Sequence, residues 1–449
     1  MSFSYTVTPK KSTLYKIFSN AGLIAILTLL VKLVAMAKEM LVAQQFGVGN
    51  ELDSFLMAYL LPQLLINVVA GSFATSFIPV FSGVIVNKEM SAARLVLQES
   101  SLILTLLLLL TVAVFYLLLP LVLPIIASGF SAEKLQQTQL LSYWLLPVIL
   151  LNGLSIFYAG VLNVKHYYSM PAMLPVLTPL AIIAVLIIYT DLGINALAMG
   201  TLMGALLEVM ILIGVLKKEG WYILPKWQGY LEETKHLLQQ YKPMIVGALI
   251  MSGTGVVDQS MAAMSGMPAG SVAALSYGNK VIALCLGLGA TAVGAAVFSH
   301  FSEMVAENKW QEINYVLANT LKAIMLITIP IVIGIIFFSE ELVSMLYQRG
   351  KFSIEDTRIV AQVQLFYGLQ VPFYLMGIVG VRLLSAMRRN DVLMKIAIVS
   401  LAINVAANWL FMQWFGVAGI ALSTALVVTI STTSILLIIH KKYEINHSF

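Results

Sequence analysis

The stretch Ser128-Gly-Phe-Ser-Ala-Glu-Lys134 returns in the second half of the chain as Arg349-Gly-Lys-Phe-Ser-Ile-Glu355. Each copy precedes an apolar run with an internal proline, Pro147 in the first and Pro372 in the second. A short basic link then follows in both places. The chain is therefore predicted to contain two related halves.

A second pair of segments supports the repeat. Gly193-Ile-Asn-Ala-Leu-Ala198 corresponds to Gly416-Val-Ala-Gly-Ile-Ala421, and Thr201 corresponds to Thr424. Repeated halves that both lie in lipid are typical of transporters that work by alternating access.

The composition is that of an integral membrane protein. Of the 449 residues, 60% are hydrophobic and 10% are charged, and the mean hydropathy is +0.92. A soluble domain carries about 25% charged residues. The net charge of +5 is small and spread over the links between apolar runs, which argues against nucleic-acid binding.

Apolar runs of about 20 residues, the length of a membrane-spanning helix, recur about twelve times. We expect an all-α integral membrane protein with about 12 transmembrane helices in two pseudo-symmetric six-helix bundles. The predicted parts are an N-terminal bundle over residues 1–216, a cytoplasmic amphipathic linker over 217–241 and a C-terminal bundle over 242–449. The expected spans are 18–43, 54–85, 99–126, 139–162, 169–190, 193–216, 242–264, 269–300, 318–345, 357–386, 391–414 and 416–440.

Basic residues predict the orientation, because short cytoplasmic loops carry an excess of Lys and Arg. Lysines in the first 19 residues, in the central link and after the last span all fall on one side. Both termini are therefore expected in the cytoplasm.

Charged residues inside spanning helices are costly and usually face a cavity or a partner. Lys32, Lys38 and Glu39 lie in the first expected span, and Lys280 lies in the eighth. A water-filled, cationic cavity between the halves would explain them, and so would structural ion pairs with other helices. Glu39 lies seven residues beyond Lys32, too far along the helix for a direct ion pair.

Two aspartates also fall at membrane depth. Asp53 opens the second span, where it either N-caps that helix, or interacts favourably with the helix dipole, or faces the cavity. Asp258, in the seventh span, either binds a coupling cation or pairs with Lys280. Glu39 is a second candidate for ion coupling.

Nothing in the sequence indicates an enzyme or a resident cofactor. The five histidines are scattered without metal-ligand spacing, and no phosphate-binding glycine-rich loop ends in Lys-Ser/Thr. A transporter, coupled either to Na⁺ or H⁺ or to the membrane potential, fits better.

One extended motif points to a family. Ala37-Lys-Glu-Met-Leu-Val-Ala-Gln-Gln-Phe-Gly-Val-Gly-Asn-Glu-Leu-Asp53 is followed by Pro62 and by Gly71-Ser-Phe-Ala-Thr-Ser-Phe-Ile-Pro-Val80. This order resembles the MurJ (MviN) family of lipid II flippases, in the multidrug/oligosaccharidyl-lipid/polysaccharide exporter superfamily. Further matches are Tyr277-Gly-Asn-Lys280 and Gly350-Lys-Phe-Ser353.

The resemblance implies roles for particular residues. Family members use arginines in helices 1 and 8 to meet the diphosphate of a lipid-linked sugar, and here Lys32, Lys38 and Lys280 match those positions. Asp53 matches the family's aspartate at the start of helix 2. The family's basic pair later in helix 2 falls at Ile66-Asn67, so that charge is absent. The family typically has fourteen helices, against about twelve expected here.

The implied function is the movement of an undecaprenyl-diphosphate-linked glycan, either lipid II or a related precursor, across the bacterial inner membrane. The implied partners are this substrate, membrane lipid and cell-wall synthesis proteins. Two other transporters stay open: an exopolysaccharide or O-antigen repeat-unit flippase, and a cation-coupled multidrug exporter. A non-transporting scaffold is a further alternative, and it would tolerate neutral residues in place of the buried charges.

Overall fold

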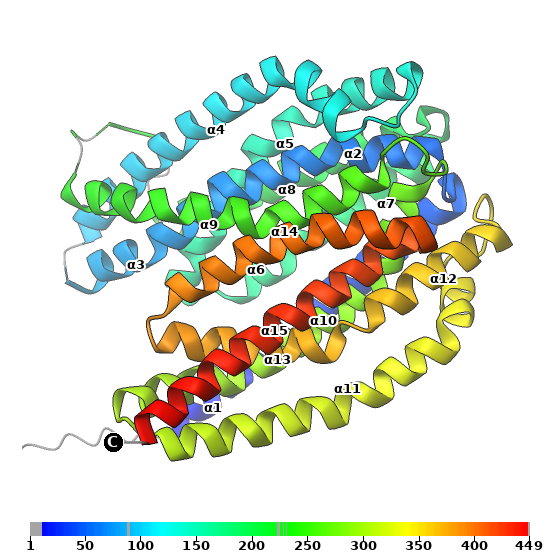
Figure 1. Ribbon diagram of the computed structural model, residues 1–449. Helices are drawn as coiled ribbons and strands as arrows, with labels where there is room; N and C mark the ends of the chain where they lie inside the picture. Colours follow the sequence, from blue (N-terminus) through cyan, green and yellow to red (C-terminus); the bar gives the residue numbers. More distant parts are fainter. Residues whose placement is uncertain (1–10, 88–89, 222–224, 228, 230, 448–449) are drawn as a thin grey trace, which may run out of the picture.

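The computed structural model describes residues 11–87, 90–221, 225–227, 229 and 231–447. Within these, the side chains of residues 11–21, 23–25, 291–292, 294–300, 302 and 442–447 lie outside the description. All regular secondary structure in the described residues is helical (Figure 1). The helices are α1 (Lys11–Phe46), α2 (Asn50–Leu65), η1 (Ile66–Gly71), α3 (Ser72–Asn87), α4 (Met90–Ile126), α5 (Ala132–Val164), α6 (Ser169–Met173), η2 (Leu174–Val176), α7 (Leu177–Ile188), η3 (Thr190–Leu192), α8 (Asn195–Lys218), α9 (Glu232–Ala262), α10 (Ser271–Ala306), α11 (Trp310–Tyr347), α12 (Ile354–Gly368), α13 (Val371–Ala386), α14 (Asn390–Phe415) and α15 (Val417–His447).

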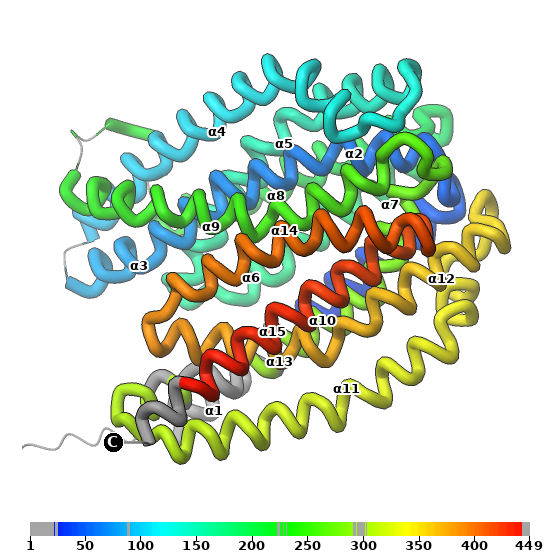
Figure 2. The backbone as a smooth tube through the Cα atoms, in the orientation of Figure 1, coloured from blue at the N-terminus to red at the C-terminus, as the bar shows by residue number. Residues whose placement is uncertain are grey.

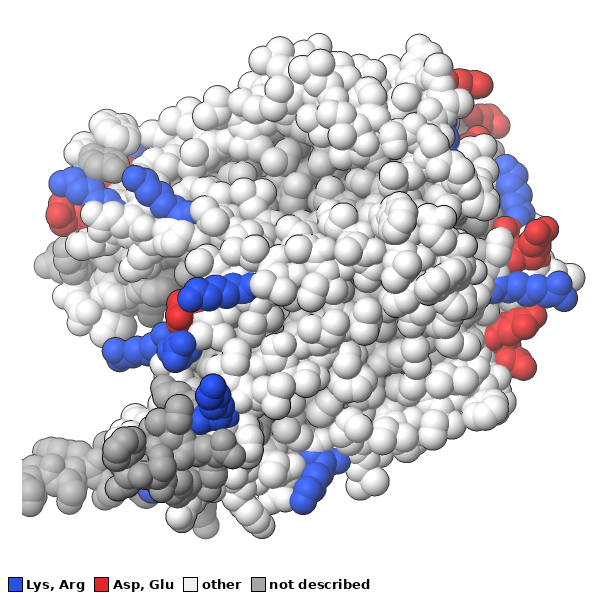
Figure 3. Space-filling model, in the orientation of Figure 1, with Lys and Arg blue, Asp and Glu red and all other residues white. Residues whose placement is uncertain are grey.

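The helices account for all the expected spans. Eleven helical segments in the described part of the chain are long and apolar enough to cross a membrane. α1, with 36 residues, corresponds to the first expected span. In Figure 3 most charged side chains on the visible face lie toward the two ends, and a broad uncharged band separates them. The all-helical membrane class is confirmed.

The repeated sequence has a local physical cause. Ser131 and Ser353 are the N-cap residues of α5 and α12, and each hydroxyl accepts a hydrogen bond from a backbone amide three residues later. Serine at this position satisfies an amide that has no partner within the helix. The same device therefore starts the corresponding helix in each half.

The second repeated segment marks a tight turn before the last helix of each half. Gly193 and Gly416 have φ values of +53° and +55°. A side chain disfavours this conformation, so glycine is the residue suited to both turns.

The second expected span is distorted near its middle. Residues Ile66–Gly71 form one turn of π-helix between α2 and α3, four residues after Pro62. Gly71 is the last residue of this π-helical turn.

α9 begins earlier than expected. The run of residues 232–241, assigned from sequence to the linker, forms the first turns of α9. The buried carboxylate of Glu99 on α4 accepts hydrogen bonds from the amide of Leu231 at 3.0 Å and from the hydroxyl of Thr234 at 2.6 Å. Glu99 thus satisfies free amide and hydroxyl donors where α9 starts.

Two helices lie across the boundary between the halves. α1 packs on α6 and α7 of the first half and on α11 of the second. α9 packs on α3 of the first half and on α14 of the second. The tube in Figure 2 shows α9 and α14 running side by side between the two groups of helices.

Candidate transport cavity and its seal

Three of the predicted site residues meet at one carboxylate. Glu39 Oε1 lies 2.6 Å from Lys38 Nζ on the same helix and 2.8 Å from Lys280 Nζ on α10. The Glu39 side chain is 12% exposed, whereas that of Lys280 is 36% exposed. The ion pair between Glu39 and Lys280 joins α1 to α10, and Lys280 stays accessible to a ligand.

The depth of this group follows from helix geometry. Glu39 lies seven residues before the end of α1, and Lys280 lies nine residues after the start of α10. At about 1.5 Å per residue, both lie roughly 10–14 Å inside the same end of the molecule. The cations are therefore well inside the apolar band.

Lys32 is separate from this group. Its side chain is exposed and has no ion pair with any described residue. It lies six residues before Lys38, about 9 Å along the axis of α1. Its expected place in the cavity stays a prediction.

Asp258 is buried in a cluster of neutral polar groups. The amides of Asn404 and Asn408 donate to Oδ1 at 3.0 and 2.8 Å, and the hydroxyl of Thr424 donates to Oδ2 at 3.0 Å. The expected alternative of a pair with Lys280 is wrong, because Lys280 pairs with Glu39 instead. Asp258 therefore has hydrogen bonds but no cation among the described residues.

A cavity of about 600 Å³ connects these two groups. Asp258 and Thr424 line one part of it, and Lys280 and Asn279 line another. Polar side chains from α12 and α13, Tyr367 and Tyr374 among them, complete the wall. One hollow thus contains both a carboxylate and an accessible ammonium group.

The Asp258 cluster has the ligand types of a hard cation. Carboxylate, amide and hydroxyl oxygens are the groups that such ions prefer. Asn404 Oδ1 and Asn408 Oδ1 are buried and have no hydrogen-bond partner among the described residues. If the side-chain amide groups of Asn404 and Asn408 rotated, these oxygens would face the carboxylate of Asp258 in place of the nitrogens. Asp258, Asn404, Asn408 and Thr424 could therefore hold a monovalent cation.

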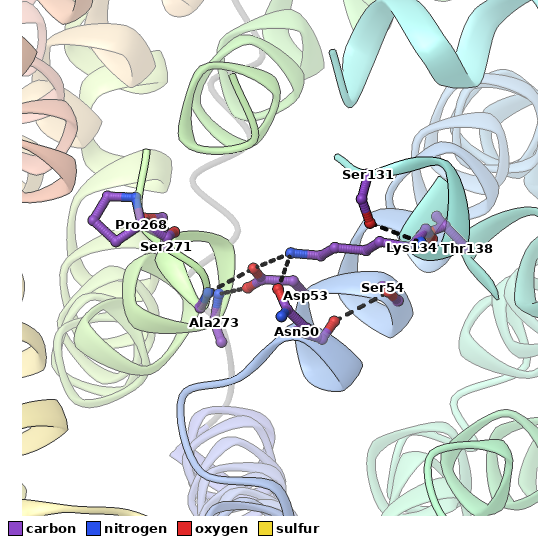
Figure 4. A network of polar contacts seen from close by, with 10 residues as sticks. Asn50, Asp53, Ser54, Ser131, Lys134, Thr138, Pro268, Ser271 and Ala273 are labelled. Atoms are coloured by element: carbon purple, nitrogen blue, oxygen red, sulfur yellow. Dashed lines mark hydrogen bonds and ion pairs between the residues drawn. The ribbon is translucent and has the colours of Figure 1, made fainter. Parts of the chain in front are cut away.

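Asp53 lies elsewhere, which corrects its expected cavity position. It is 1% exposed, and its two oxygens accept hydrogen bonds from the backbone amides of Gly270 and Ala273 at 2.8 Å each. Lys134 Nζ lies 2.8 Å from Asp53 Oδ2 (Figure 4). Asp53 is also not the N-cap of α2, which is Gly49. Its carboxylate instead caps the start of α10 in the other half.

Backbone contacts at the same end hold the halves together. The amide of Gly129 donates to the carbonyl of Ala263 at 2.9 Å, and the amide of Lys351 donates to that of Gln44 at 2.9 Å. A Cβ at Gly350 would collide with the backbone of Gln44. We call this set of contacts, together with Asp53, the seal.

Sequence reasoning missed two parts of this arrangement. Lys134 appears in the sequence only as the last residue of the repeated stretch, although it is the ion-pair partner of Asp53. Glu99 lay at the edge of an expected span and was not singled out. For Glu99 the available signal was an acidic residue beside a long apolar run, and this does not reveal partners more than a hundred residues away.

Comparisons with known proteins agree with this geometry. The family model described as "Lipid II flippase MurJ" matches residues 42–448. The chain belongs to the MurJ family. Such membership, with the apolar helices, makes it a multi-pass protein of the bacterial inner membrane.

Individual MurJ relatives are distant but matched over most of their length. A probable lipid II flippase MurJ from Rhizobium tropici is 24% identical over 423 residues, covering 90% of this chain and 78% of that protein. One from Synechocystis sp. is 26% identical over 451 residues, with coverage of 94% and 81%.

Solved structures show the same fold. The chain superposes on a lipid II flippase MurJ in an inward closed conformation with a TM-score of 0.81, at 24% identity, covering 93% of this chain and 87% of that one. An inward-facing MATE multidrug transporter of the MOP superfamily gives a TM-score of 0.75 at 15% identity, with coverage of 94% and 98%. The expected MATE/MOP-like architecture is confirmed.

Proposed function

We propose that the chain moves a polyprenyl-diphosphate-linked cell-wall precursor, lipid II or a related lipid-linked glycan, across the bacterial inner membrane. The observation that carries the proposal is the meeting of Lys38 of α1 and Lys280 of α10 at one carboxylate beside a cavity. A diphosphate in a low-dielectric slab needs compensating cations at mid-depth.

Glu39 neutralises the two lysines while no substrate is bound. Without substrate, its carboxylate compensates both ammonium groups, so neither is left unpaired in the membrane. A diphosphate entering the cavity would compete with Glu39 for Lys280, the more exposed of the two. Lys32 is proposed to extend the same cationic path along α1.

The seal is proposed to lie on the periplasmic side. Lysine-rich links support a cytoplasmic location for the opposite end and for both termini. The cavity then takes its cargo from the cytoplasmic side in this conformation. Alternation would require the seal to break and the bundles 1–216 and 242–449 to rock about the 217–241 link.

Asp258 is proposed as the site of the coupling ion, Na⁺ or H⁺. A cation there would change the charge of the same cavity that Lys280 lines. Binding of the ion and of the anionic substrate would therefore influence each other through a shared wall.

Reconstitution in vesicles tests the substrate class. The purified chain is inserted with fluorescent undecaprenyl-linked sugars that carry either a diphosphate or a monophosphate, and the fraction reaching the far leaflet is measured. We expect faster transfer of the diphosphate form. Parallel vesicles receive a cationic dye and an undecaprenyl-diphosphate O-antigen unit.

Each outcome other than the expected one would favour one alternative function. Export of the dye without transfer of the glycan would mean a multidrug exporter. Transfer of the O-antigen unit alone would mean a repeat-unit flippase. If correctly inserted protein transferred none of these compounds, the result would favour the non-transporting scaffold.

A further inference from the structure

A second cavity lies at the end of the molecule opposite the seal. It measures about 290 Å³ and lies where α4 begins and where α5 and α8 end. Its lining residues are Met90, Arg94, Leu162, Lys165, Tyr167, Glu219, Gly220 and Trp221. None of them belongs to the transport cavity or to the seal.

Cationic groups form one side of this cavity. Lys165 Nζ lies 5.0 Å from the centre of the Trp221 ring, and no carboxylate among the described residues pairs with it. Trp221 is itself 5% exposed and packs against Phe81, so it is a fixed wall. The guanidinium of Arg94 lies beside Gly220 on the same side.

A carboxylate forms the other side. The hydroxyl of Tyr167 donates to Glu219 Oε2 at 2.8 Å, which fixes the orientation of Glu219 and raises the pKa of Tyr167. Glu219 is the C-cap residue of α8. A negative charge at a helix C-terminus is unfavourable, because the carbonyl groups there carry partial negative charge.

Helix dipoles account for the position of the cationic Lys165 but not for that of the anionic Glu219. Lys165 follows the C-terminus of α5, where a cation is favourable without any ligand. Glu219 has no such explanation. A ligand that brought its own cation to Glu219 and its own anion to Lys165 would complement both sides.

We propose that this cavity binds a zwitterionic phospholipid head group, with the phosphate at Lys165 and Arg94 and the primary ammonium at Glu219. The volume is roughly ten times the share of one water in the liquid, about 30 Å³, which suits a phosphate with a short amine arm.

The surroundings suit the rest of a lipid. Basic residues place this end at a membrane interface, where phospholipid phosphates lie. Met90 and Leu95 on α4 are 46% and 40% exposed, and the apolar surface of α4 continues toward the bilayer centre. Acyl chains of a lipid held by its head group would lie along this surface.

Thermal unfolding of the full chain in detergent tests the proposal. Short-chain phosphatidylethanolamine, short-chain phosphatidylglycerol, O-phosphoethanolamine and inorganic phosphate are each titrated, and apparent affinities follow from the rise in Tm. We expect saturable stabilisation, strongest for phosphatidylethanolamine. Lys165→Gln should lower the apparent affinity for phosphatidylethanolamine and for phosphatidylglycerol about tenfold, as expected for one lost charge-assisted contact.

Glu219→Gln separates the amine from the phosphate. It should remove the preference for phosphatidylethanolamine over phosphatidylglycerol and leave the affinity for phosphatidylglycerol equal or higher. Lys217→Gln, which removes an exposed lysine of α8 outside the cavity, is the matched control and should change neither affinity.

The proposal would be overturned by a Tm rise that does not saturate, by unchanged lipid affinities in Lys165→Gln, or by a preference for phosphatidylethanolamine that persists in Glu219→Gln. Equal protection by inorganic phosphate or O-phosphoethanolamine would mean a soluble phosphate ligand, which also overturns the assignment to lipid.

Discussion

At the level of single residues, the side chain of Asp53 is held in one conformation by contacts to three groups. Both oxygens accept backbone amides of α10, and one also meets Lys134. Asp53→Asn keeps the shape but removes the charge, and loss of one partner of a buried pair costs about 3–5 kcal/mol. We expect the amides of residues 270–273 to exchange with deuterium much faster in the variant.

The matched control for Asp53→Asn is Asp191→Asn. Asp191 is an exposed aspartate in the short η3 segment and has no ion pair with a described residue. Its replacement should leave the exchange of residues 270–273 unchanged. Equal protection of these amides in the Asp53 variant and the parent chain would mean that Asp53 does not hold the seal.

Asp258→Asn addresses the coupling ion. An amide retains hydrogen-bonding capacity toward Asn404, Asn408 and Thr424 but supplies no negative charge. We expect transport by the variant to become insensitive to Na⁺ or to a pH gradient, whichever drives the parent chain. Asp391→Asn, at an exposed pair with Arg389, should retain the dependence. A variant of Asp258 that still responds to the ion would refute this assignment.

The candidate site was predictable only in part, and charge explains which part. Lys38, Glu39, Asp258 and Lys280 could be singled out because a charge in an apolar run needs compensation wherever it lies. Their partners could not be assigned, since pairing depends on how helices from different halves are rotated and placed. The partners of Asp53 illustrate this limit. Its carboxylate oxygens accept hydrogen bonds from backbone amides, and every non-proline residue has such an amide, so the sequence does not reveal which ones are bonded.

At the level of helices, Glu99 determines where α9 starts. Its carboxylate bonds Leu231 and Thr234, whereas a glutamine would offer a weaker, neutral acceptor. Glu99→Gln should destabilise the first turn of α9 by about 1–2 kcal/mol and speed hydrogen exchange over residues 231–236. Glu307→Gln, which removes an exposed pair with Lys309 outside α9, is the control. Equal exchange in both variants would contradict the capping role.

Helix existence was predictable, and helix ends less so. Apolar runs of spanning length predict where helical segments cross the membrane, because an unsatisfied backbone cannot stay in lipid. The start of α9 at Glu232 depends on Glu99, which lies on another helix.

At the level of the whole molecule, the seal joins the halves at one end, and the proposed alternation requires them to separate there. The hydroxyl of Ser265 donates to the carbonyl of Ser128 at 3.3 Å across the seal. Ser128→Cys with Ser265→Cys, in a Cys285→Ala background, can be joined by a short reducible cross-linker. We expect cross-linking to stop transport and reduction to restore it.

The control for the cross-link lies within one half. Ser344 and Gln348 are one helical turn apart and hydrogen-bonded, so a cross-link between cysteines there restrains no movement between halves. That protein should transport normally with the link in place. Normal transport by the Ser128–Ser265 cross-linked protein would show that the seal does not open.

The most direct test of the account removes the cations that converge on the cavity. Lys38→Gln with Lys280→Gln is compared with the parent chain in vesicles that contain a diphosphate-linked glycan, with Lys235→Gln and Lys309→Gln as exposed controls. We predict that the double variant inserts normally but transfers the glycan about a hundredfold more slowly, the loss expected for two charge-assisted contacts. Transfer at the parental rate by correctly inserted double variant would contradict a cationic cavity as the basis of transport.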